Sequence, residues 1–160
     1  ILNPAPANPL PDELLANVDI LIPNESELSL LTDLPVNDSA SAERAAKKLL
    51  QRGVKVVIVT LGSKGALLVT GTQVTHVDTY KVEVVDTTAA GDAFIGGFAS
   101  KILMRSRSSL TPTDAQESAS YAKEIEDTVR YACACGALAT TKFGAQPSLP
   151  AKEEVEKFVK

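Results

Sequence analysis

The chain has 160 residues, 44% of them hydrophobic and 22% charged, which is ordinary for one globular domain with its own core. Its formal net charge is −4 and no Lys/Arg cluster stands out, so neither nucleic acid nor an anionic membrane is an expected partner. The longest apolar runs, such as VKVVIVTLG at 54–62, are too short to span a bilayer.

The first residues, ILNPAPANPLP, carry neither an initiator Met nor the basic n-region of a signal peptide. Ile1 and Leu2 are typical of the end of a strand, so we expect the chain to be part of a longer protein. Cys133 and Cys135 would point to different faces of a helix, which favours two buried hydrophobic residues over a disulfide. The only histidine, His76, does not complete a zinc set with them, and nothing indicates an oxidising compartment.

Hydrophobic patterning predicts alternating strands and helices in the first half of the chain. The elements are a strand at 18–22, helices at 24–32 and 39–52, and strands at 54–60, 66–70 and 73–85. Gly53 would end the second helix, and the β-branched run at 54–60 is typical of a central parallel strand. Gly71 and Thr72 form a predicted turn, and His76 is predicted to be a surface residue of the strand that follows.

The second half is predicted to be mostly helical. Its elements are helices at 92–104, 121–142 and 150–160, a loop at 144–150, and a polar surface loop or partly disordered insertion at 105–120. The middle helix has a face of small residues suited to close packing or to the approach of a ligand, made up of Ala132, Cys133, Gly136, Ala137 and Thr140. The order of the elements predicts an α/β layered sheet in a single domain, residues 1–160.

DTTAAGDAF, residues 86–94, runs from a strand-like segment into the helix that carries Phe94 and Phe98. A helix N-terminus has unpaired N–H groups and a partial positive charge, and small residues before it would let an anion reach those donors. Asp92 in the first turn would stay ionised and could accept a proton from an attacking hydroxyl, as a catalytic Asp does in kinases. The alternative is that Asp92 only stabilises the helix start and that Gly91 only makes the turn.

Two further motifs have the same two interpretations. TLGSKG, residues 60–65, could bring backbone N–H groups to a phosphate, or it could be a tight turn between strands; it is not a Walker A motif. NESE, residues 24–27, could organise a metal–nucleotide complex through Asn24 and Glu27, or it could be a capping box.

Together these motifs resemble one family, the ribokinase-like sugar kinases, also called the PfkB family. DTTAAGDAFIGGF is similar to the C-terminal signature of that family. NPAPA, LPDELL, PNESEL, VTLGSKGALL and TTKFGAQPSLP match the family in the same order, and the resemblance covers essentially the whole chain. NPAPA and the GAQPS loop favour a member that phosphorylates ribose.

The resemblance implies a role for each matching residue. Asp92 is implied to be the catalytic base, which contacts the sugar and deprotonates its 5-hydroxyl for attack on the γ-phosphate of ATP. The implied anion hole consists of Ala89, Ala90 and Gly91, and Asn24 and Glu27 are implied to organise phosphate and Mg²⁺. The implied nucleotide-binding residues are Asn24, Thr60, Leu61, Gly62, Ser63, Lys64, Gly65, Gly91, Asp92 and Cys133. The implied ligands of an activating K⁺ ion are Asp86, Thr88, Ala139, Lys142, Gly144 and Ser148.

The resemblance also implies a fold: a three-layer, Rossmann-like sheet with helices on both faces, without the family's N-terminal part and its β-sheet lid. Because that part supplies most of the sugar contacts, we expect little or no kinase activity from these 160 residues alone. Two features depart from the family. Cys133 occupies a position that the resemblance places beside the adenine, where Asn or His is frequent in the family. The insertion at 105–120 is longer than in bacterial members and fits a eukaryotic one.

The implied activity is ATP-dependent phosphorylation of D-ribose at its 5-hydroxyl, with ATP and D-ribose as partners and Mg²⁺ and K⁺ as cofactors. The parent protein is expected to be a homodimer through the lid and to lie in the cytoplasm, or also in the nucleus if its source is eukaryotic. Two alternatives remain open here. One is another kinase of the family, such as a fructokinase or a nucleoside kinase, and the other is a non-catalytic nucleotide-binding domain.

Overall fold

The structure is a computed structural model that describes residues 1–104 and 115–160, with side chains for 1–103 and 121–160. The chain divides into two compact units, Ile1–Val77 and Asp78–Lys160, and each is described by itself. The sequence predicts that residues 1–160 form one domain, and this stays a prediction. In the described part of the chain, no helix is both long and apolar enough to cross a membrane.

A four-stranded mixed sheet is the centre of the first unit. Its strands lie in the order of the sequence, namely β1 (Ile20–Leu21), β2 (Val56–Thr60), β3 (Ala66–Thr70) and β4 (Val74–Val77). β2 pairs in parallel with β1, as its apolar sequence predicts, but it is antiparallel to β3, which is in turn antiparallel to β4. The tight loop at 61–65 causes this antiparallel pairing, because it returns the chain directly to the neighbouring strand.

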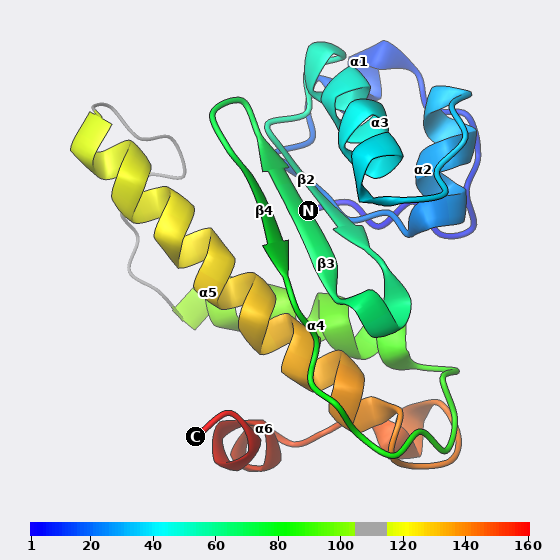
Figure 1. The fold of residues 1–160 in the computed structure, drawn as a ribbon, viewed down its shortest axis with the longest axis vertical. Helices are drawn as coiled ribbons and strands as arrows, with labels where there is room; N and C mark the ends of the chain where they lie inside the picture. Colours follow the sequence, from blue (N-terminus) through cyan, green and yellow to red (C-terminus); the bar gives the residue numbers. More distant parts are fainter. Residues whose placement is uncertain (105–114) are drawn as a thin grey trace. The chain divides into compact units, whose positions relative to one another are not determined.

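Three α-helices accompany the sheet, α1 (Asp12–Leu15), α2 (Glu25–Thr32) and α3 (Ser39–Gln51), and the loop between β2 and β3 contains a short 3₁₀ helix, η1 (Gly62–Lys64). α3 packs against β2 and β3 (Figure 1). Its buried face, which includes Ala45 and Leu49, joins Val57 and Val59 of β2 in one hydrophobic core. Gly53 ends this helix region as predicted, because its φ of 105° is left-handed and a Cβ there would lie 2.8 Å from the Cα of Ala16.

Two predictions for residues 1–85 are wrong. The alternation at 73–85 predicts one long strand, but β4 ends at Val77 and the residues after it are irregular. The backbone of the last predicted residues bonds elsewhere, since the N–H of Val85 donates to the carbonyl of Thr140 at 2.7 Å. The second error is the omission of α1, which follows Pro11 and has Asp12 and Glu13 in its first turn, an N-terminal pattern that could have revealed it.

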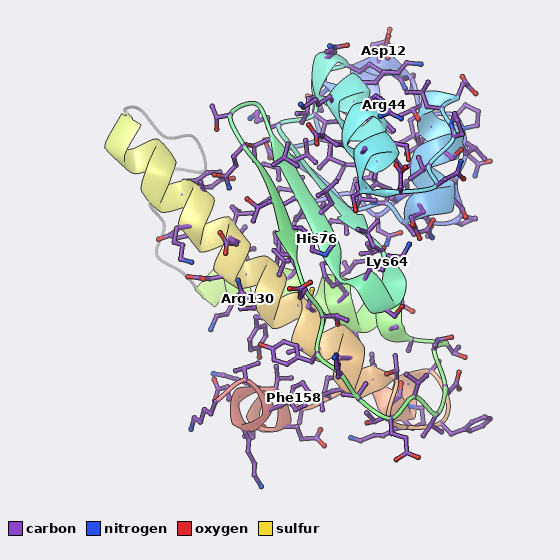
Figure 2. The ribbon with its side chains drawn as sticks, in the orientation of Figure 1. Asp12, Arg44, Lys64, His76, Arg130 and Phe158 are labelled. Atoms are coloured by element: carbon purple, nitrogen blue, oxygen red, sulfur yellow. The ribbon has the colours of Figure 1, made fainter. Side chains whose placement is uncertain are left out.

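Outside residues 105–114, the second unit contains three α-helices, α4 (Ala90–Met104), α5 (Ala115–Ala139) and α6 (Lys152–Phe158), with a short 3₁₀ helix η2 (Gln146–Ser148) before α6. α4 begins two residues earlier than predicted and α5 ends three residues earlier. The predicted insertion at 105–120 is wrong for 115–120, which are helical, while 105–114 lie outside the described residues. α6 confirms the predicted last helix, which carries Phe158 (Figure 2). The ring centroids of Phe158 and Tyr80 lie 5.0 Å apart.

Small residues let α4 and α5 pack closely. A Cβ on Gly136 would lie 3.2 Å from the carbonyl oxygen of Ala90, and a Cβ on Gly97 would lie 2.5 Å from the Sγ of Cys135. The predicted small-residue face of the long helix therefore packs against α4, and through Gly136 it touches the first turn of that helix. Phe94 and Phe98 of α4 are buried.

Candidate nucleotide and phosphoryl-transfer site

The two motifs of the first unit lie side by side at the end of β2. The N–H of Thr60 donates to the carbonyl of Pro23 at 2.9 Å, and Asn24 forms an isolated parallel bridge with Thr60. NESE follows β1 and TLGSKG follows β2, so the parallel pairing of these strands brings the ends of both strands to one edge of the sheet. The structure thus joins two motifs whose sequence positions alone do not place them together.

Asn24 and Glu27 form a reciprocal cap at the start of α2. The Oδ1 of Asn24 accepts from the N–H of Glu27 at 2.8 Å, and the Oε2 of Glu27 accepts from the N–H of Asn24 at 2.8 Å. The capping-box interpretation is confirmed, while the phosphate and Mg²⁺ role stays a prediction. The pair fits Mg²⁺ chemistry, because Mg²⁺ at nucleotides takes one or two carboxylates together with phosphates and water, and Glu27 is only half-buried.

The loop between β2 and β3 is a tight turn with two left-handed glycines. Gly62 has a φ of 57° and Gly65 a φ of 89°, and the N–H of Leu61 donates to the carbonyl of Gly65 at 2.8 Å. The tight-turn interpretation is confirmed. A Cβ on Gly62 would meet nothing within 4 Å, so the backbone is accessible beside this glycine, as approach to a phosphate requires.

In the second unit, Asp86 joins two segments that are far apart in sequence. Its Oδ1 accepts from the N–H of Thr88 at 3.0 Å and from the hydroxyl of Thr88 at 2.5 Å, and its Oδ2 accepts from the N–H of Gly144 at 2.9 Å. The N–H groups of Val85 and Asp86 both donate to the carbonyl of Thr140. The side-chain hydrogen bond from Thr88 and the backbone bonds from Gly144 and Thr88 hold the pKa of Asp86 below its ordinary value.

This lowered pKa predicts a loss of stability in acid. The folded protein binds the Asp86 proton more weakly than the unfolded chain, so the stabilisation is present above the unfolded pKa of about 3.9 and is lost as pH falls through the folded pKa. We expect Asp86→Asn to be less stable than wild type at pH 7, and the difference to shrink at pH 3. Urea unfolding of both proteins at the two pH values measures this, and a pH-independent difference would contradict it.

The start of α4 presents free backbone donors. The first intrahelical bond of α4 runs from the N–H of Ala93 to the carbonyl of Ala89 at 2.9 Å, and the N–H of Ala90 donates to Thr87. Among the residues that the structure describes, no acceptor faces the N–H groups of Gly91 and Asp92. Both residues are exposed, and a Cβ on Gly91 would meet nothing within 4 Å. Two unpaired amides, a partial positive charge and open space therefore coincide at Gly91 and Asp92. Of the predicted anion-hole residues Ala89, Ala90 and Gly91, Ala90 uses its N–H within the turn, and the anion hole itself stays a prediction.

The oxygen atoms predicted to bind K⁺ come from the same linked segments. The turn at 86–88 and the segment at 139–148 are connected through Asp86, Thr140 and Gly144, as described above. Ser148 is buried and its hydroxyl donates to the carbonyl of Ala145, while the side chain of Lys142 pairs with Glu154 at 2.8 Å. Such a set of carbonyl and carboxylate oxygens fits a monovalent cation, and the ion itself stays a prediction.

Cys133 is buried, with 3% of its surface exposed, and burial raises the pKa of its thiol to about 12. Its thiol is therefore neutral and nearly inaccessible one helical turn before Gly136, and the contact with adenine stays a prediction. Cys135 is also buried, and within the described residues both cysteines are free thiols, as their spacing predicts.

Comparison with known proteins identifies a family. Residues 1–152 match the pfkB family of carbohydrate kinases. A ribokinase from Staphylococcus aureus is 40% identical over 97% of this chain and 46% of its own length. The structure of a ribokinase from Thermotoga maritima aligns with a TM-score of 0.80 at 39% identity, covering 98% of this chain and 47% of that one. A ribokinase from Arabidopsis thaliana complexed with ribose and ATP aligns with a TM-score of 0.80 at 35% identity, over 96% of this chain and 44% of that one.

Relatives named for other sugars have sequence identities to this chain that are close to those of the ribokinases. A deoxyribokinase from Salmonella typhimurium is 34% identical over 99% of this chain and 47% of its own length. Fructokinase-1 from rice is 37% identical over 88% of this chain and 39% of its own length. The chain spans about half the length of the curated relatives it matches. The fold is of the ribokinase-like α/β class, and the chain belongs to the pfkB family of carbohydrate kinases.

Proposed function

We propose that the protein phosphorylates D-ribose at its 5-hydroxyl with ATP, and that this chain supplies the nucleotide-binding residues and the catalytic base. The observation that carries the proposal is the start of α4, where the exposed Asp92 lies next to free amide donors. Similarity to several ribokinases supports the choice of sugar, and the structure of a ribokinase with ribose and ATP supports the choice of phosphoryl donor.

In the proposed reaction the carboxylate of Asp92 accepts the proton of the sugar hydroxyl. At the same time the oxygen of that hydroxyl forms a bond to the γ-phosphorus of ATP. The bond from that phosphorus to the bridging oxygen breaks, and ADP leaves. The free N–H groups of Gly91 and Asp92 bind the oxygens of the transferred group, where a helix N-terminus stabilises negative charge. The loop at 60–65 and Asn24 are proposed to contribute to nucleotide binding.

Two ions accompany this proposal. Mg²⁺ would be held by Glu27 and Asn24 together with the phosphates, and it would offset their charge. K⁺ would be held by the oxygens of the 86–88 turn and the 139–148 segment. The parent protein is proposed to act in the cytoplasm as a homodimer.

Two other functions follow from particular observations. The deoxyribokinase and fructokinase relatives favour a kinase of the same family with another sugar. The capping role of Asn24 and Glu27 would suit a non-catalytic nucleotide-binding domain in which Asp92 only stabilises the helix start.

A substrate panel on the full-length protein tests the proposal. With ATP present, we expect kcat/KM for D-ribose to exceed the values for 2-deoxyribose, fructose and adenosine by at least about tenfold, which is about 1.4 kcal/mol in transition-state free energy. A preference for any of the other three would replace ribose with that substrate. Binding of ATP without turnover of any of them would favour the non-catalytic function.

Gly91→Ala tests the anion hole without disturbing the fold. The added methyl group meets no atom of the described structure, and alanine is a better helix former, so we expect stability to be unchanged or slightly raised. The methyl group would occupy the space through which a phosphoryl oxygen reaches the amides, so turnover should fall about tenfold or more. Gly96→Ala, on the same helix and also in open space, should leave turnover unchanged and stability unchanged or raised, and equal turnover in both variants would contradict the anion hole.

A further inference from the structure

His76 is bonded to the backbone of the predicted nucleotide loop. It lies on β4 opposite Leu67 of β3, and its Nε2 is 2.7 Å from the carbonyl oxygen of Lys64 (Figure 2). A carbonyl can only accept, so Nε2 carries the proton and donates it. Sequence reasoning predicts only a surface residue here, and the side chain is indeed exposed, but its bond reaches a loop twelve residues earlier.

This bond engages a carbonyl that the turn's own hydrogen bonds do not use. Inside the turn, the carbonyls of Leu61, Gly62 and Gly65 accept from the N–H groups of Lys64, Gly65 and Leu61, at 3.1, 3.1 and 2.8 Å. The carbonyl of Lys64 instead accepts from the imidazole. The side chain of a neighbouring strand therefore adds a hydrogen bond that the turn cannot make by itself.

The bond fixes the orientation of one peptide group. Because a trans peptide is planar, the carbonyl of Lys64 and the N–H of Gly65 point in opposite directions. While His76 holds the carbonyl, the N–H of Gly65 must point toward the carbonyl of Gly62, to which it donates. Glycine tolerates both orientations of such a peptide, and the loop has glycines at 62 and 65. The hydrogen bond from His76 to Lys64 therefore selects one conformation of the loop among several.

We propose that His76 is a positioning residue that holds the loop at 61–65 in its nucleotide-binding conformation. The inference rests on the proposed function, since it takes this loop as part of the ATP site. The imidazole acts through the Lys64 peptide, so its loss should weaken nucleotide binding and leave the chemical step and the sugar site unchanged.

The test compares His76→Leu and His76→Gln in the full-length protein. Leucine removes the donor, so we expect the Kd for ATP to rise about three- to tenfold. We expect kcat at saturating ATP and the KM for ribose to stay within about twofold of wild type, and the Tm to stay within about 2 °C. The side-chain amide of glutamine can donate to the same carbonyl, so we expect it to restore the affinity to within about twofold. Val74→Leu, two residues earlier on the same strand, is the matched control and should leave Kd unchanged.

Three outcomes would overturn the inference. The first is a leucine variant that binds ATP as tightly as wild type. The second is an equal loss of affinity in the leucine and glutamine variants, and the third is a parallel change in Kd, kcat and ribose KM. Titration of the wild type with ATP separates this inference from the proposed function. A wild type that binds no ATP would overturn both. A wild type that binds ATP, together with a leucine variant of equal affinity, would overturn only the role of His76.

Discussion

Asp92→Asn should reduce kcat of the full-length protein by about 10² to 10⁴-fold, the usual contribution of a general base, while the Kd for ATP stays close to that of wild type. The amide of asparagine keeps the size and the hydrogen-bonding capacity of the side chain but cannot take a proton from the sugar hydroxyl. In free energy the loss corresponds to about 3 to 5 kcal/mol of transition-state stabilisation. Steady-state kinetics with ribose, together with an ATP titration, measures both quantities.

The same variant separates catalysis from helix stabilisation. An acid in the first turn of a helix contributes about 0.3 to 1 kcal/mol, so a purely structural Asp92 would lower the Tm slightly and leave turnover unchanged. Asp33→Asn is the matched control, because Asp33 is also exposed, lies outside the motifs, and has a left-handed φ of 54° that asparagine accepts. Unchanged turnover in Asp92→Asn would refute the base role.

Gly97→Ala should destabilise the second unit by about 1 to 3 kcal/mol, because the new methyl group overpacks the contact between α4 and α5. Its Cβ would lie 2.5 Å from the Sγ and 2.9 Å from the Cβ of Cys135, so one of the two helices must shift. The greater helix propensity of alanine offsets part of this loss. Thermal unfolding should show a Tm lower by several degrees.

A second substitution tests the cause of that loss. Cys135→Ala removes the Sγ and leaves the Cβ, so in the Gly97→Ala background it should restore part of the lost stability. The two changes should therefore be non-additive, with a coupling free energy of at least about 0.5 kcal/mol. Gly96→Ala, one residue earlier in open space, should not lower the Tm, and strict additivity of the first two changes would argue against a steric contact.

The sequence predicts those features whose causes are local. The capping box of Asn24 and Glu27 needs only four consecutive residues, and Gly53 ends its helix because glycine adopts a left-handed φ without strain. The tight turn between β2 and β3, one of the two interpretations of TLGSKG, needs only the glycines of a short segment between two apolar runs. In the candidate site, the position of Asp92 in the first turn of a helix is also set by local sequence, so it could be predicted.

Features that depend on distant partners could not be predicted from the pattern. Residues 78–85 alternate like a strand, but the N–H of Val85 bonds to the carbonyl of Thr140, and no property of either residue indicates this pairing. Asp86 binds the N–H of Gly144 across 58 positions, and His76 binds the loop at Lys64. Backbone carbonyls and amides make at least one side of each of these contacts, and since nearly every residue has such groups, residue type carries no signal for that side.

The free amides at the start of α4 also have a consequence for the dynamics of this helix. α2 and α3 begin with capping boxes, whereas Ala89 before α4 has no side-chain oxygen that could accept from Gly91 or Asp92. The first turn of α4 should therefore fray more easily, and these two amides should exchange their hydrogens rapidly in the ligand-free protein. An anion bound there would complete the helix end and slow this exchange, so ligand binding and the folding of this turn are coupled.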